Sequence, residues 1–393
     1  MAGAEPAGPP MFDALTERAL RDGRSLKWTR YGPAIGAFVA EMDFGTAPAV
    51  TRSLHETVGR GQLGYLTPEA AADMARACAG WQARRYGWKV PAEWITPLAD
   101  VVAGLQAAIE RFSPPGSPVV LPTPAYMPFL AVPGALGRDL IQVPMVERDG
   151  RMGYDLDGIA AAFDSGARLF VHVNPHNPLG RVFDVDEQLA LAEVVATAGA
   201  RVFSDEIHAP LVYPGAVHRP YASLSPETAR HTVTATSTSK AWNVPGLKTA
   251  QLILSDPEDV EHWARVGFMY GHGAATPGVL AATAAYDDGA DWLDDVLGYL
   301  DGNRHFLAEL LADRLPQVRY TPPEGTYLAW LDCRRLGLEG SAGAFFLDRA
   351  GVALVDGPEC GAPGAGHVRL NFATPRPVLT AIVDRMAAAV GTR

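Results

Sequence analysis

The sequence predicts an α/β fold, with a mostly parallel sheet in a large domain and a smaller α+β domain beside it. The chain has 393 residues, which is more than a single hydrophobic core usually needs. Short apolar runs alternate with amphipathic stretches from about residue 100 to residue 255, as in a parallel sheet covered by helices. After about residue 290 this pattern changes. We therefore expect two domains.

Five short apolar runs are the expected strands of the large domain. They are residues 118–122, 168–173, 201–204, 232–236 and 250–254. Short runs rich in apolar and β-branched residues are typical of strands that are buried on both faces of a sheet. Parallel neighbours need crossover connections, which are usually helices.

Residues 184–198 are the clearest of these predicted crossover helices. Asp184 can cap the N-terminus together with Glu187 three residues later, and Gly199 can end the helix. The residues expected to share its buried face are Leu189, Ala192 and Val195.

The smaller domain is expected to follow residue 290. An Asp- and Leu-rich helical stretch comes first, and a strand-like segment follows at 325–331. A glycine-rich loop then leads to a second strand-like segment at 367–372.

Charge and composition exclude several classes of protein. The formal charge is −11 and no basic run occurs, which speaks against a nucleic-acid partner because phosphate binding needs clustered cations. No run approaches the roughly 20 apolar residues of a membrane span, and the N-terminus lacks the features of a signal peptide. We expect a soluble, cytoplasmic protein without a membrane partner.

The rare residue types also carry information. The three cysteines, Cys78, Cys333 and Cys360, are widely separated, so they indicate neither a disulfide framework nor a metal site, and no metal is expected. Only four of the 33 basic residues are lysines. They are Lys27, Lys89, Lys240 and Lys248.

Four polar clusters follow the predicted strands directly, at 123–126, 174–178, 205–208 and 237–240. Ligands of open α/β sheets bind at the carboxyl ends of the strands. An aromatic residue, an amide, a carboxylate and a lysine, one from each cluster, therefore predict a single ligand site.

Lys240 and Asp205 suggest the chemistry of that site. A strand-end lysine with a lowered pKa can form a Schiff base with pyridoxal 5'-phosphate (PLP) and later carry the substrate's α-proton. Asp205 can pair with the pyridine nitrogen and keep it protonated. The alternatives are a surface lysine and an aspartate that caps a helix.

Three further residues can contact the PLP ring. His208 and Asn177 can reach its phenolic oxygen, and Tyr126 can stack on its face. The alternatives are a plain Asn-Pro loop for Asn177 and core packing for Tyr126.

The phosphate group is expected at the start of the helix that begins after Asp100. The backbone amides of Val101 and Val102 are the candidates, because the N-terminus of a helix attracts anions. Additional side-chain contacts are expected from Ser237, Ser239 and Lys248.

Arg369 lies in the strand-like segment of the smaller domain and can hold a substrate α-carboxylate through a bidentate pair. The alternative is an exposed structural arginine. Tyr126 and Asn177 are further candidates for contact with the substrate.

With these residues assembled, the chain resembles fold-type I PLP enzymes of the aminotransferase class I/II superfamily. It is most similar to carbon–sulfur β-lyases of the cystathionine β-lyase type. The matching segments span nearly the whole chain and are 25–28, 40–44, 64–65, 124–126, 174–178, 204–208, 239–240, 243–247 and 369–376. Asp-Glu-Ile-His at 205–208 is the most specific match, since ordinary aminotransferases usually carry tyrosine at the fourth position.

The resemblance implies a large PLP-binding domain with a mostly parallel seven-stranded sheet over residues 46–288. Residues 1–45 and 289–393 would form the small α+β domain. It also implies a homodimer with active sites at the interface, where Tyr65 reaches the phosphate of the other chain. The family pattern is broken at Thr29, Asp100 and Cys360, where an acid, a glycine and a phenylalanine are common.

The resemblance implies β-elimination from a cysteine S-conjugate to give a thiol, pyruvate and ammonia, with Lys240, Asp205 and Tyr65 as catalytic residues. One alternative is an aminotransferase, and another is an enzyme that decarboxylates or oxidatively deaminates an S-conjugate. A PLP-binding regulator without catalysis is disfavoured, because no DNA-binding segment is visible.

Overall fold

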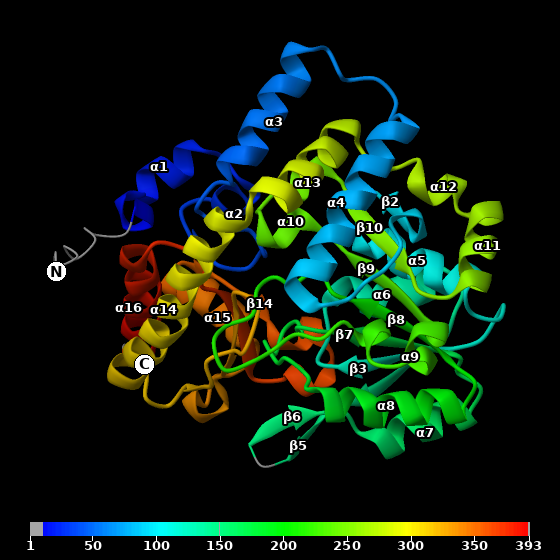
Figure 1. The fold of residues 1–393 in the computed structure, drawn as a ribbon. Coiled ribbons are helices and arrows are strands. Elements are labelled where there is room, and N and C mark those ends of the chain that lie inside the picture. The colour runs from blue at the N-terminus through cyan, green and yellow to red at the C-terminus, as the bar shows by residue number, and fades with distance from the viewer. Residues whose placement is uncertain (1–10, 149, 392–393) are drawn as a thin grey trace, which may run out of the picture.

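The computed structural model describes residues 11–148 and 150–391, and it has the α/β fold that the sequence predicts (Figure 1). A seven-stranded sheet has the strand order β2-β10-β9-β8-β7-β3-β4. Its strands are β2 (Ile95–Leu98), β3 (Val119–Thr123), β4 (Leu140–Pro144), β7 (Leu169–Val173), β8 (Arg201–Asp205), β9 (Thr232–Thr236) and β10 (Ala250–Leu254). β10 pairs antiparallel with β2 and with β9, and the other pairings of this sheet are parallel, so the sheet is mostly parallel.

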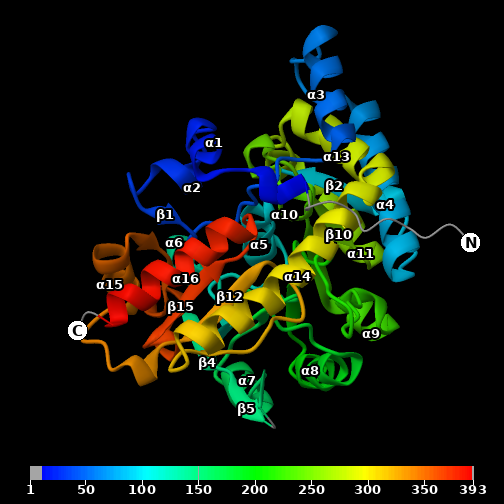
Figure 2. The same ribbon diagram turned by 90° about the vertical axis from the view of Figure 1, so that its left-hand side faces the viewer.

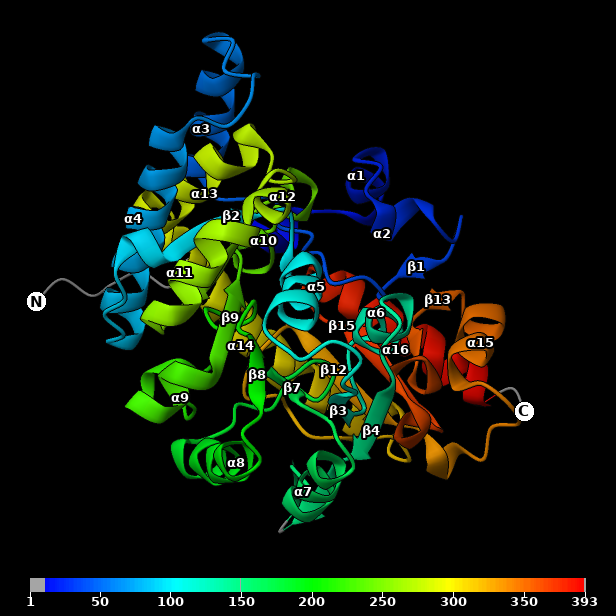
Figure 3. The same cartoon turned by 90° about the vertical axis from the view of Figure 1, so that its right-hand side faces the viewer.

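Helices cover both faces of this sheet (Figure 3). Alternate residues of β3 show the two sides, since Val119 and Leu121 pack with α5 and α6 whereas Val120 packs with α7 and α8. The principal helices are α4 (Pro68–Tyr86), α5 (Val101–Arg111), α6 (Met127–Ala135), α7 (Leu156–Asp164), α8 (Val185–Thr197), α9 (Pro226–His231), α11 (Pro257–Val266) and α13 (Thr276–Asp288).

Helix α8 has the predicted capping box, in which the Asp184 carboxylate accepts from the amide of Glu187 and the Glu187 carboxylate accepts from the amide of Asp184. The prediction of its buried face was wrong at one position. Leu189 is 37% exposed and Leu191 is buried, because the helix is rotated so that 191, 192 and 195 face the sheet.

A second sheet lies in the C-terminal part of the chain, with the strand order β11-β12-β15-β14. These strands are β11 (Arg319–Tyr320), β12 (Leu328–Asp332), β14 (Val355–Asp356) and β15 (His367–Asn371). The long helices α14 (Ala290–Arg314) and α16 (Arg376–Gly391) pack together beside this sheet (Figure 2).

The N-terminal segment joins this C-terminal part through the parallel pair β1 (Ile35–Gly36) and β13 (Val352–Ala353). The pairing supports the predicted division into a large domain, 46–288, and a small domain formed by 1–45 and 289–393. This division stays a prediction. Residues 1–10 lie outside the described residues. The remaining helices and strands are α1 (Glu17–Asp22), α2 (Leu26–Thr29), α3 (Pro48–Gly59), β5 (Val146–Arg148), β6 (Arg151–Gly153), α10 (Thr238–Ala241), α12 (Phe268–Gly271) and α15 (Ala342–Phe345). Across the described ranges, no helix combines the length and the apolar character that crossing a membrane requires.

Candidate active site

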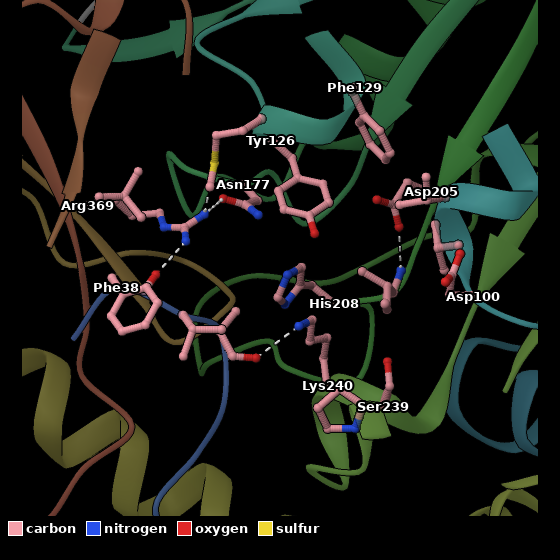
Figure 4. Close-up of a pocket in the computed structure, with 18 of the residues that line it drawn as sticks. Phe38, Asp100, Tyr126, Phe129, Asn177, Asp205, His208, Ser239, Lys240 and Arg369 are labelled. Carbon is pink, nitrogen blue, oxygen red and sulfur yellow. Dashed lines mark hydrogen bonds between the residues drawn. The ribbon is translucent and has the colours of Figure 1, made fainter. Parts of the chain in front are cut away.

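A cavity of about 450 Å³ opens where the carboxyl ends of the parallel strands meet the C-terminal sheet and the N-terminal segment (Figure 4). Its wall includes most of the side chains that the sequence predicts for the site. These are Val101, Val102, Tyr126, Asn177, Asp205, His208, Ser239, Lys240, Lys248 and Arg369. The fold thus brings together residues that lie up to 268 positions apart in the sequence, from 101 to 369.

Lys240 lies on the single turn of α10, directly after β9. Its Nζ points into the cavity and donates to the backbone carbonyl of Ala40 at 2.9 Å. Ser237 caps this turn: its hydroxyl accepts from the amide of Ser239 at 3.0 Å and donates to the carbonyl of Thr249 at 2.7 Å. Ser237 therefore fixes the conformation of this turn and does not line the cavity.

The surroundings of Lys240 increase the fraction of its amine that is neutral. Burial and repulsion by the Arg369 guanidinium lower the pKa of Lys240 to about 8, although Glu41 and Asp205 oppose this shift. Two other lysines have carboxylate partners: Lys27 binds Asp43 at 2.8 Å, and Lys248 binds Asp100 at 2.5 Å. Lys240 is therefore the lysine best suited to act as a nucleophile.

Asp205 is the last residue of β8, and the residue is 4% exposed. Oδ1 accepts from the amide of Ile207 at 3.0 Å. Burial, together with the neighbouring Glu206, raises the pKa of Asp205 to about 7, although the Ile207 amide and Lys240 oppose this rise. A cation placed in the cavity would lower this pKa again, so the site favours a positively charged group next to Asp205.

Polar atoms without partners mark the centre of the cavity. Nδ1 of His208 is buried and has no hydrogen-bond partner among the described residues, and burial holds the pKa of this histidine well below its usual value. A neutral imidazole can give or accept a hydrogen bond there. Tyr126 lies nearby with its ring in the cavity (Figure 4).

Arg369 projects from β15 into the side of the cavity opposite Asp205 in the view of Figure 4. It is 2% exposed, so the alternative of an exposed structural arginine is wrong. Its guanidinium donates to Oδ1 of Asn177 at 3.0 Å and to the carbonyl of Phe38 at 2.7 Å, which fixes its orientation. Nε is buried and has no partner among the described residues, and the charge is available to a carboxylate.

The start of α5 has the free backbone amides that the predicted anion site requires. Asp100 caps this helix by accepting from the amide of Ala103 at 2.9 Å. No described residue accepts a hydrogen bond from the backbone amides of Val101 and Val102. Lys248 neutralises Asp100, which explains how a carboxylate is accommodated beside a site for an anion.

The predicted site residue Tyr65 and two departures from the family pattern, Thr29 and Cys360, are not among the residues that line the cavity. Tyr65 is 89% exposed and does not line it, so any role of Tyr65 requires a second chain. Thr29 donates to the carbonyl of Ser25 at the surface. Cys360 is buried, its pKa is raised to about 11 by burial, and its carbonyl accepts from the amide of Ala125 at 2.8 Å.

Sequence reasoning missed part of the wall. The missed residues include Arg30, Tyr31, Phe38, Ala40 and Glu359. The segment 40–44, which matches the family pattern, was a possible signal for Ala40, whereas Arg30 is an exposed charge without such a signal. Glu359 is also exposed, and its signal is the capping box that it forms with Asp356 at the start of a short 3-10 helix, Gly357–Cys360.

The family can be assigned by comparison. The model of the family "Aminotransferase class I and II" matches residues 38–386. The chain belongs to this family. A cystathionine β-lyase of Corynebacterium glutamicum is 38% identical over 377 residues, which cover 96% of this chain and 99% of that protein.

Solved structures agree with this assignment and with the predicted fold. A PLP-bound C–S lyase from Staphylococcus hominis superimposes with a TM-score of 0.89 at 29% identity, covering 96% of this chain and 98% of that chain. Cystalysin from Treponema denticola, whose structure contains PLP, has a TM-score of 0.90 at 27% identity and covers 97% of this chain and 99% of its own.

The cavity of this chain fits PLP group by group. An orphaned Nδ1 on His208 and the amide of Asn177 suit the phenolic oxygen, and Asp205 suits a protonated ring nitrogen. The start of α5 suits the phosphate, and Lys240 suits the aldehyde.

Proposed function

We propose that this protein is a PLP-dependent carbon–sulfur β-lyase that cleaves a cysteine S-conjugate to a thiol, pyruvate and ammonia. The observation that carries the proposal is the opposition of Arg369 and Asp205 across a cavity into which the Lys240 amine projects. Relatives named as cystathionine β-lyase and C–S lyase support the same reaction.

PLP supplies an electron sink that stabilises negative charge at the substrate's α-carbon. Lys240 would carry this cofactor between turnovers. Asp205 would keep the ring nitrogen protonated, and the amides of Val101 and Val102 would hold the phosphate. Ser239 and Lys248 lie near enough to the same end of the cavity to assist.

The chain's own residues account for the steps at the substrate. Arg369 binds the α-carboxylate and, with Asn177, fixes its direction. The free amine of Lys240 removes the α-proton, and the Cβ–S bond then breaks with its electron pair leaving on sulfur. The thiolate takes up a proton, and water completes the release of pyruvate and ammonia.

The wall around the expected sulfur position suggests the form of the thiol part. Tyr31, Phe38, Met127 and Leu354 provide an apolar surface, and the charged Arg30 and Glu359 also line the cavity. We propose a substituent with a short apolar stem and a polar end. Arg30 and Glu359 would then contribute to the choice of substrate.

A homodimer is part of the same proposal. Exposed apolar side chains gather around a second hollow that Tyr65 and Phe268 line, and they include Leu63 at 62% and Phe268 at 77% exposure. A second copy of the chain on this surface would bury them and bring Tyr65 to the neighbouring active site. A cytoplasmic location stays a prediction.

Aminotransfer is the second candidate, because the family includes this reaction in its name. A direct comparison of rates separates the two. The protein would be incubated with S-alkyl cysteines and with cystathionine, and separately with common amino acids plus a 2-oxoacid. Faster release of thiol and pyruvate than any amino-group transfer supports the lyase, and the reverse order rejects it.

A further inference from the structure

The backbone carbonyl of Ala40 accepts two hydrogen bonds in the cavity wall. One comes from Nζ of Lys240 at 2.9 Å, and the other comes from the hydroxyl of Tyr327 at 3.0 Å. A carbonyl oxygen has two lone pairs, and the two donors together use both. The position of this oxygen and its strength as an acceptor therefore affect where the Lys240 amine lies and how readily it is protonated.

The segment that carries Ala40 is fixed on both sides. The carbonyls of Val39 and Glu41 accept from Nδ2 of Asn371 at 2.7 and 2.6 Å. The carbonyl of Phe38 accepts from Arg369. The Ala40 carbonyl consequently has little freedom to follow Lys240 when the amine moves.

Tyr327 is suited to act as a permanent donor. Its side chain is completely buried, and burial raises its pKa far above the working range of pH, so the hydroxyl keeps its proton. Its ring meets the ring of His208 edge-on with centroids 6.0 Å apart. The ring of Tyr327 thus packs against His208 while its hydroxyl donates to the Ala40 carbonyl.

We propose that Tyr327 is a positioning residue for Lys240, which acts through the shared carbonyl of Ala40. This rests on the proposed function, in which the free amine of Lys240 removes the α-proton. A carbonyl that already accepts from Tyr327 is a weaker acceptor for an ammonium group, so the neutral, basic form of Lys240 is favoured. The same bond keeps the carbonyl directed at the position of the free amine.

The other charges around Lys240 stay unchanged when the Tyr327 hydroxyl is removed. They are Asp205 and Glu41, which raise its pKa, and Arg369, which lowers it; the buried neutral His208 lies beside them. Tyr327→Phe therefore isolates the contribution of one hydrogen bond and keeps the ring against His208.

The test compares Tyr327→Phe with the wild type. The pKa that governs the acidic limb of kcat should rise by about 0.1–0.7 pH unit, because one hydrogen bond changes the strength of a coupled bond to a charged group by about 10–30%. Near neutral pH, kcat should then fall by up to about fivefold while KM stays nearly constant. Replacement of Tyr327 by 3-fluorotyrosine keeps the hydroxyl as a stronger donor and should shift the same pKa downward.

Tyr213→Phe is the matched control. Tyr213 is also buried, and its hydroxyl donates to the carbonyl of Thr326, one residue before Tyr327, without contacting Ala40. This variant should lose stability in thermal unfolding and keep the wild-type pH profile. Equal pKa shifts in the two variants would reduce Tyr327 to a structural role.

A second readout does not depend on activity. Competitive labelling of the full-length, cofactor-free chain with acetic anhydride across pH gives the pKa of the Lys240 amine directly. A rise in Tyr327→Phe and a fall with 3-fluorotyrosine support the proposal even if the protein has no lyase activity. An unchanged Lys240 pKa in both proteins overturns it, whatever reaction the enzyme performs.

Discussion

Single side chains set the chemistry of this cavity, and Lys240 is the most consequential of them. Its lowered pKa, near 8, leaves an appreciable neutral fraction at physiological pH. As the pH falls through 8 the free amine becomes protonated, and its ability to attack a carbonyl or to remove a proton is lost.

Borohydride reduction of the holoenzyme should link the cofactor covalently to Lys240. The expectation follows from the carboxylate partners that hold Lys27 and Lys248, which leave Lys240 as the free amine in the cavity. Peptide mapping by mass spectrometry locates the modified residue. A label on Lys27, Lys89 or Lys248 would sink the assignment.

Asp205→Asn should keep the fold and lower kcat by about a hundredfold or more, because an uncharged amide cannot hold a proton on the ring nitrogen. The measurement is steady-state kinetics with a folding check by circular dichroism. Glu206→Gln is the control for a buried charge outside the cavity, where Glu206 accepts from the Ser204 hydroxyl and the Tyr221 amide. Loss of the Glu206 charge removes one cause of the raised Asp205 pKa, so this variant favours the ionised Asp205 carboxylate and should keep its turnover. Near-normal turnover in a folded Asp205→Asn variant refutes the role.

Among the secondary-structure elements, the segment 38–43 links the N-terminal part of the chain to the active site. Asp43 anchors it by accepting from Nζ of Lys27 and from the indole of Trp28, both at 2.8 Å. Both members of the ion pair are almost completely buried. This anchor keeps the carbonyl of Ala40 within reach of Lys240.

Lys27→Met should destabilise the protein by about 3–5 kcal/mol, because it leaves the buried Asp43 charge without its partner. Chemical denaturation measures the loss. The double variant Lys27→Met with Asp43→Asn removes the uncompensated charge and keeps an acceptor for Trp28, so it should recover a large part of the stability. No difference between the single and double variants would contradict a buried ionic anchor.

The elements differ in how well the sequence predicts them, for physical reasons. Strands inside the sheet such as β9 and β10 are uniformly buried, and the segments predicted for them coincide with the observed bounds. The edge strand β4 is only partly buried and β2 contains Pro97, so neither has a comparable signal. In α8 the capping residues were predicted from the sequence. The rotation of the helix about its axis, which exposes Leu189, depends on how the helix packs on the sheet.

The site was predictable where a residue follows a strand end or starts a helix, as for Asp205 and Val101. Arg369 was proposed from its place in a strand-like segment and from the affinity of arginine for carboxylates, and it lines the cavity. Ser237 follows a strand end as predicted, but its hydroxyl already bonds to backbone groups of the turn that it caps and does not face the cavity. Tyr327 was missed, because its effect passes through a carbonyl that comes from 287 residues earlier.

At the scale of the whole molecule, the active site is expected to be complete only in a dimer. Tyr65 lies at the surface of its own chain, within stacking distance of His272 at 6.2 Å between ring centroids and away from the cavity. A second chain would have to supply this hydroxyl.

Mixing inactive Tyr65→Phe with inactive Lys240→Ala should restore about a quarter of the wild-type activity. Random exchange gives about half hybrid dimers, and each hybrid has one site with both groups intact. Subunit exchange is verified by native mass spectrometry before the assay. Absence of recovery after demonstrated exchange counts against a shared site.

The most direct test of the proposed lyase follows the carboxyl carbon of its substrate. A cysteine S-conjugate labelled with ¹³C at the carboxylate is turned over, and the products are identified by NMR. If Arg369 holds the carboxylate and Lys240 removes the α-proton, all the label should appear in C1 of pyruvate, with one thiol released for each pyruvate. Label in carbon dioxide with an unlabelled aldehyde, or in an intact 2-oxoacid that still carries its sulfur, would contradict β-elimination.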